Sequence, residues 1–83
     1  MFEERDRVIL TGDLPDYGLE AGDVGTVVLV HNGGAGYEME FVALDGETIA
    51  VVSAHPHQIR QAASREVPHA RAVAQRDNYG LTR

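Results

Sequence analysis

The chain has 83 residues, enough for one small domain whose core leaves it only marginally stable. It has no cysteine, which excludes disulfides and thiolate metal sites, and no apolar run of the ~20 residues that a membrane helix needs. Its net charge of −6 disfavours a nucleic-acid partner, and its charged first residues are unlike a signal peptide. We therefore expect a soluble, cytoplasmic protein.

The charge is divided unevenly along the chain. Residues 1–59 carry eleven acidic side chains against two arginines, a balance of −9. Residues 60–83 carry five arginines against two acidic side chains, a balance of +3. This change of sign predicts two units, a folded acidic domain over residues 1–60 and a basic C-terminal tail over residues 61–83.

The first unit shows β patterning along its whole length. Residues 37–43 alternate, with Tyr37, Met39 and Phe41 facing inward and two glutamates facing outward. Glycine-rich and Asp-Gly turns separate the β segments, as in hairpins. Strands are predicted over residues 6–12, 24–31, 37–43 and 47–54, followed by one helical turn over 55–58 and a short strand from Ile59.

The stretch Gly22–Asp23–Val24–Gly25 directly precedes the second predicted strand. A glycine loop that binds phosphate instead follows a strand and opens a helix. Nearby acidic side chains would also repel a phosphate. We therefore interpret Gly22 and Gly25 as turn and bulge positions that bend the strand. The fold predicted is all-β, a small SH3-like five-stranded barrel, with a C-terminal extension that allows a short helix.

Residues 5–60 resemble the SH3-like barrels, and among them a family of small bacterial proteins described as a domain of unknown function. The resemblance is carried by Asp6, Val8 and Leu10, by the run from Asp13 to Val28, by Glu38, Glu40 and Phe41, and by Asp45 to Thr48. The "GDVGTV" core is also similar to the KOW motif and to the SH3-like domain of nitrile hydratase β subunits. The resemblance implies protein binding, including roles as the antitoxin or immunity half of a pair. It transfers no catalytic residue.

The sequence contains weak candidates for a metal site and no signature of an enzyme. His55 and His57 would project to the same side of an extended segment, and His31 or Glu47 could add a third ligand. Two histidines around a proline are also ordinary turn residues. Neither serine lies in a nucleophile motif, so we expect no enzyme activity, no cofactor and no metal.

The tail has helix signals over residues 67–81, with Pro68 near the start and Gly80 at the end. Ala70, Val73 and Ala74 would then form an apolar stripe, with Arg71 and Gln75 facing away. A helix this short is marginal alone in water, so a disordered end is an equal alternative. The tail could order on a partner, on the acidic face of its own barrel, or on a second copy in a homodimer.

The leading functional hypothesis is a non-enzymatic protein-binding module, the antitoxin or immunity partner of a basic toxin. The alternatives are an accessory or assembly subunit of a larger enzyme complex and, third, a KOW-like RNA-binding domain. The body's charge and the scarcity of stacking aromatic residues disfavour nucleic acid. The residues expected to contact a protein partner are Asp13, Asp16, Tyr17, Glu38, Glu40, Arg65, Arg71, Val73, Arg76 and Tyr79.

Overall fold

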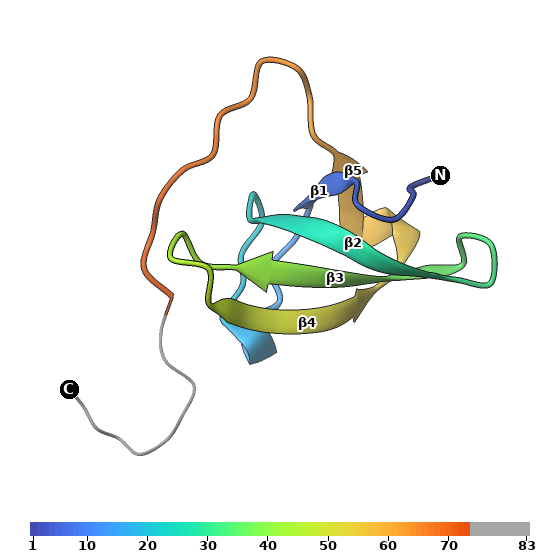
Figure 1. Cartoon of the computed structure of the whole chain (residues 1–83), viewed down its shortest axis with the longest axis horizontal. Helices are drawn as coiled ribbons and strands as arrows, with labels where there is room; N and C mark the ends of the chain where they lie inside the picture. The colour runs from blue at the N-terminus through green and yellow to red at the C-terminus, as the bar shows by residue number, and fades with distance from the viewer. Residues whose placement is uncertain (74–83) are drawn as a thin grey trace.

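The computed structural model describes residues 1–73, and its strands form one antiparallel sheet (Figure 1). The strand order is β4-β3-β2-β1-β5. The strands are β1 (Arg7–Leu10), β2 (Val24–His31), β3 (Gly36–Val42), β4 (Thr48–Ala54) and β5 (Ile59–Gln61). The predicted all-β class and the five strands are confirmed. The bounds of β2 match the prediction, the start of β5 does too, and the ends of β1, β3 and β4 differ from it by at most two residues.

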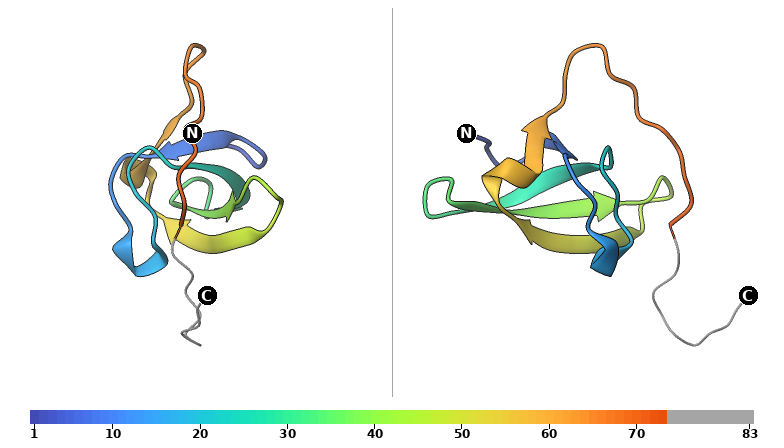
Figure 2. Two further views of the ribbon diagram at one scale, coloured as in Figure 1. Left: turned by 90° about the vertical axis from the view of Figure 1, so that its left-hand side faces the viewer. Right: turned by 180° about the vertical axis from the view of Figure 1, so that it is seen from behind.

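The sheet curls around its core without closing into a continuous barrel (Figure 2). Strands β4 and β5 lie at its two edges and are not paired with each other. The predicted helical turn is the 3-10 turn η2 (Pro56–Gln58), which carries the chain from β4 to the far side of β1. The short strand β5 pairs antiparallel with β1 through Ile59, Arg60 and Gln61.

The core follows the alternation seen in the sequence. Tyr37, Met39 and Phe41 are buried on the inner face of β3, and Glu38 and Glu40 point outward, as predicted. All of the buried residues are apolar or aromatic among those the structure describes. The inner cluster is formed by Val8, Leu10, Leu19, Val27, Tyr37, Met39, Phe41, Val52, Ala54 and Ile59.

Gly25 has a different role from the one predicted. The register shift in β2 falls between Val27 and Leu29, so the bulge lies at Val28 rather than at Gly25. A Cβ atom at Gly25 would lie 2.8 Å from the Phe41 ring and 3.1 Å from the Met39 methyl. Glycine is therefore required at this position by close packing across the core, and not by bending of the strand. Gly22 does occupy a turn, with φ of +96°.

The tail segment, which we define as residues 62–73, forms no helix. It leaves β5, arcs away from the sheet and returns to the opposite end of the molecule (Figure 2). The predicted helix over 67–81 is therefore wrong over 67–73, and its remaining residues lie outside the described chain. A helix this short gains little alone, whereas the extended segment lets Arg71 reach Asp23. No helix within residues 1–73 is long and apolar enough to cross a membrane.

Candidate functional site

The connection between β1 and β2 is an acidic loop, residues 13–23, which carries four carboxylates. It folds back on itself through two backbone hydrogen bonds between Leu14 and Leu19, of 2.9 and 3.1 Å. The 3-10 turn η1 (Pro15–Tyr17) forms its tip, and Gly18 follows with φ of +71°. The loop is thus a small ordered hairpin at one end of the sheet.

The hydrophobic core anchors this hairpin. Leu19 is buried in the inner cluster, and Leu14 packs partly against the same cluster. The amide of Gly22 donates to the carbonyl of Leu10 at 2.9 Å, and the amide of Leu10 donates to the carbonyl of Asp23 at 3.0 Å. These bonds continue the pairing of β1 and β2 into the loop, so its acidic side chains have a defined position.

Two of the carboxylates stabilise the loop from within. Asp13 accepts a hydrogen bond from the amide of Ala21 at 2.9 Å. Asp23 accepts one from the amide of Glu20 at 2.8 Å, and its own amide donates to the carbonyl of Glu20 at 3.0 Å. Such Asp-to-backbone bonds are a common way of fixing a turn. The carboxylate of Asp23 is therefore oriented by the backbone that surrounds it.

Arg71 of the tail segment binds directly to this loop. Its Nε donates to Asp23 Oδ1 at 3.0 Å, and its Nη2 donates to Asp23 Oδ2 and to the carbonyl of Gly18, the latter at 3.0 Å. Its Nη1 lies 3.6 Å from a carboxylate oxygen of Glu20. The side chains of Arg71 and Asp23 keep only 24% and 20% of their exposure, so this pair is better shielded than a typical surface salt bridge.

The pair shifts the acidity of both groups. Burial raises the pKa of Asp23, but the hydrogen bonds from Arg71 and from the amide of Glu20, together with the charge of Arg71, outweigh it. The net pKa of Asp23 lies below its usual value. The hydrogen bond to Asp23 raises the pKa of Arg71 against the effect of burial, and the charges of Asp23, Glu20 and Asp13 add to it. The carboxylates of Asp13, Glu20 and Asp23 thus all stabilise the positive charge of the Arg71 guanidinium.

The structure divides the predicted partner-binding residues into separate regions. Asp13, Asp16 and Tyr17 lie in the acidic loop, and Arg71 and Val73 contact that loop from the tail segment. Contrary to the predicted helix, Arg71 faces the body of the protein. Arg65 is exposed in the tail segment, while Arg76 and Tyr79 lie outside the described residues.

The remaining two predicted residues, Glu38 and Glu40, lie on the outer face of the sheet, the side of β2, β3 and β4 opposite the core. Glu38 is 3.0 Å from His31 Nε2, and Glu40 accepts a hydrogen bond from the Thr48 hydroxyl at 2.7 Å. The same face carries three half-exposed apolar side chains, those of Leu29, Val42 and Val51. This face is therefore mixed, with paired carboxylates among aliphatic groups.

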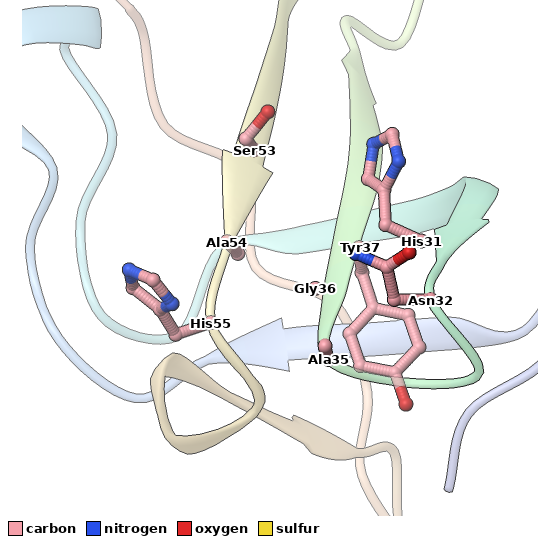
Figure 3. Close-up of a pocket in the computed structure, with 8 residues that line it drawn as sticks. All are labelled: His31, Asn32, Ala35, Gly36, Tyr37, Ser53, Ala54 and His55. Atoms are coloured by element: carbon pink, nitrogen blue, oxygen red, sulfur yellow. The ribbon is translucent and has the colours of Figure 1, made fainter.

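A shallow hollow of about 200 Å³ lies where β2 turns into β3 and where β4 ends (Figure 3). Figure 3 shows His31 and Ser53 on opposite sides of the β3 ribbon, and no hydrogen bond joins them. His31 uses its Nε2 to contact Glu38 instead. His31 and Ser53 therefore do not form a serine–histidine pair in this hollow. The hollow is lined by His31, Asn32, Ala35, Gly36, Tyr37, Ser53, Ala54 and His55.

His55 and His57 stand side by side at the turn after β4. Their rings stack with centroids 5.6 Å apart and planes 6° from parallel. The amide of His55 donates to the side-chain oxygen of Gln58 at 2.7 Å, so this segment is fixed by its own turn. Within residues 1–73, no group of three or more histidine, aspartate or glutamate side chains is arranged to hold a metal ion.

Comparison with known proteins places this architecture in a family. The family described as a domain of unknown function (DUF4926) matches residues 4–61, which span all five strands and the acidic loop. The chain belongs to the DUF4926 family. No protein of curated function and no solved structure matches the chain. The DUF4926 region ends at the last residue of β5, before the segment that carries Arg71.

Sequence reasoning missed the central residues of the loop site in this DUF4926 protein. The local pattern identifies Asp23 and Glu20 only as two of the acidic side chains that would repel a phosphate. Charge complementarity between the acidic body and the basic tail indicated docking of the tail on its own domain as one of three alternatives, but it did not identify the residues that meet. Local spacing could not pair Asp23 with Arg71, which lies 48 residues further along.

Proposed function

We propose that this chain is a non-enzymatic protein-binding module whose partner presents a basic surface. The observation that carries the proposal is that the acidic loop already binds an arginine, through Asp23, Gly18 and Glu20. The balance of −9 over residues 1–59 supports it, since such a field would speed association with a basic protein. The cytoplasmic role that we favour is that of an antitoxin or immunity partner covering a basic toxin.

An accessory subunit of a larger enzyme complex is the second candidate, and the outer face of the sheet favours it. Leu29, Val42 and Val51 are 42%, 47% and 51% exposed there, and an assembly would cover them. An RNA-binding role has less support, because Tyr37 and Phe41 are buried in the core and cannot stack on bases. A neighbouring gene for a small basic chain would favour the antitoxin role, and a metabolic operon the subunit role.

Affinity capture from source cells tests the proposal with two variants of equal charge. Asp13→Asn/Asp16→Asn/Glu20→Gln neutralises three carboxylates of the acidic loop. Glu3→Gln/Glu4→Gln/Glu47→Gln removes three charges from other exposed positions. We expect the loop variant to retain about tenfold less of a stoichiometric basic protein, the control to retain it, and binding to weaken as salt rises. A captured nucleic acid, equal losses in both variants, or salt-independent capture would contradict the proposal.

A further inference from the structure

The contact between Arg71 and the acidic loop has the geometry of a ligand in a binding site. Nε and Nη2 meet the two oxygens of Asp23, while Nη2 also meets the Gly18 carbonyl. Nη1 faces the carboxylate of Glu20 at 3.6 Å. All three nitrogens of the guanidinium therefore face acceptors or negative charge. A lysine ammonium is a single point charge and cannot reproduce this planar arrangement.

The segment that delivers Arg71 is held loosely elsewhere. Residues 61–70 are all exposed, and the Arg60–Glu66 ion pair that closes the first turn is itself on the surface. Among residues 62–73, Arg71 makes the side-chain hydrogen bonds to the acidic loop, and Val73 lies beside Gly18. Since few contacts hold it, the segment can leave the loop without disturbing the sheet or its core.

Gly18 adds a second element of recognition beside the guanidinium. Val73 lies beside Gly18, since a Cβ atom at Gly18 would make an ordinary van der Waals contact of 3.5 Å with a methyl group of Val73. Val73 is half-buried in this position, whereas Ala72 between the two contacts is exposed. In the extended segment 71–73, the loop therefore contacts the first residue, Arg71, and the third, the small aliphatic Val73.

We propose that the acidic loop is a recognition site for an arginine-x-valine segment in extended conformation, that Arg71 is its internal occupant, and that a partner's arginine replaces Arg71. This inference rests on the proposed function and names the chemistry by which the basic partner is recognised. The tail segment then acts as a built-in competitor, because a tethered arginine is present at an effective concentration on the order of millimolar. Partners that present lysine, or arginine on a rigid helix, are disfavoured.

The test uses the full chain and the synthetic peptide EVPHARAV, which copies residues 66–73. Peptide is titrated into isotopically labelled wild-type and Arg71→Ala protein while the amide signals of Gly18 and Glu20 are followed by NMR. The Arg71→Ala protein, whose site is vacant, should bind the peptide about threefold or more tightly than the wild type does. The same peptide with Arg71→Lys should bind more weakly.

Two further variants separate recognition from general charge attraction. Asp23→Asn in the Arg71→Ala background keeps an acceptor for the amide of Glu20 but removes the carboxylate, and should abolish binding. Glu4→Gln in the same background removes one charge from an exposed position outside the acidic loop and should leave binding unchanged. Equal affinity of wild type and Arg71→Ala, equal affinity for the arginine and lysine peptides, or binding that survives Asp23→Asn would overturn the inference. So would the absence of peptide binding to Arg71→Ala at millimolar concentration.

The peptide experiment and the capture experiment can fail independently. If the loop-neutralised variant loses its cellular partner while the peptide does not bind Arg71→Ala, the acidic loop binds the partner without recognising an arginine specifically. This inference then fails and the proposed function stands. If the peptide binds Arg71→Ala but the loop variant retains its partner, the arginine site exists and the proposed use of it fails.

Discussion

At the scale of single residues, Gly25 shows how closely the sheet is packed. Phe41 is buried, and its ring occupies the space that a side chain at position 25 would need. Gly25 also pairs with Val8 on β1, which is fully buried, so neither neighbouring strand can move away freely. The ring, rather than any backbone requirement, therefore determines which residue is allowed here.

We expect Gly25→Ala to destabilise the protein by about 1–3 kcal/mol, as is typical of overpacking in a core. Urea unfolding followed by circular dichroism measures this directly. The matched control is Gly12→Ala, where a Cβ atom would meet nothing within 4 Å. That control should change stability by no more than about 0.5 kcal/mol. Similar values for the two variants would mean that Phe41 does not constrain position 25.

Asp23 gives a second prediction at this scale, through its titration. Its pKa in the folded protein lies below the ordinary value of 3.8, so its pairing with Arg71 contributes fully above that pH. The contribution is lost as the pH falls through the folded pKa, when the carboxylate becomes neutral. Carbon-detected NMR of the side-chain carboxyl should therefore give a midpoint below 3.8 in the wild type and a higher one in Arg71→Ala.

Glu66 is an internal control for that titration. The hydrogen bonds from Arg60 and from the amide of Ala63 hold its pKa at about 2. The two donors to Glu66 are the Arg60 side chain and the Ala63 amide, and Arg71 is not one of them. Arg71→Ala should therefore leave the titration midpoint of Glu66 unchanged. A common shift of both carboxyls would indicate a general change of charge, and would contradict a specific contact between Arg71 and Asp23.

At the scale of elements, the acidic loop depends on one leucine. Leu19 joins the inner cluster although it belongs to a connection rather than to a strand. It also makes both backbone hydrogen bonds that close the hairpin with Leu14. Burial of this side chain therefore couples the position of the carboxylates to the core of the sheet.

Leu19→Ala should destabilise the protein by about 2–5 kcal/mol, the usual cost of emptying a buried leucine site. Leu44→Ala is the control, because Leu44 is 94% exposed in a hairpin and should change stability by about 0.5 kcal/mol or less. Thermal unfolding of both variants gives the comparison. If Leu19→Ala were as mild as Leu44→Ala, the loop would not be anchored in the core.

At the scale of the whole molecule, charge opposes folding. The balance of −9 over residues 1–59 gathers like charges on a small surface, and the structure places all eleven acidic groups of that region outside the core. Arg71 relieves part of this repulsion by neutralising Asp23 within the acidic loop. Net charge far from zero disfavours the compact state through self-repulsion.

We therefore expect added sodium chloride to stabilise the protein at neutral pH. Between about 0.02 and 0.2 M salt, where the Debye length falls to below roughly 10 Å, the urea midpoint should rise. The rise should be larger in Arg71→Ala, which has lost one compensating positive charge. A midpoint that falls with salt in both proteins would show that attractive pairs outweigh the repulsion.

The sequence by itself determined most of the sheet. Alternation in residues 37–43, β-branched residues in 24–31 and glycine turns located four strands, the 3-10 turn and the beginning of β5, because these are local properties of the chain. The same local reasoning failed at Gly25, where the constraint comes from Phe41 on another strand. Local reasoning failed again over residues 67–73, where it predicted a helix. The structure there instead has Arg71 bound to Asp23, 48 residues away in the same chain.

Only the tertiary structure decided which charges meet. The site exists because β1 and β2 hold the acidic loop at one end of the sheet, and because the tail segment arcs from β5 back to that end. Asp23 and Arg71 are 48 residues apart, and no periodicity relates positions so distant. Secondary structure depends mainly on neighbours along the chain, whereas an ion pair depends on where the fold places its two residues.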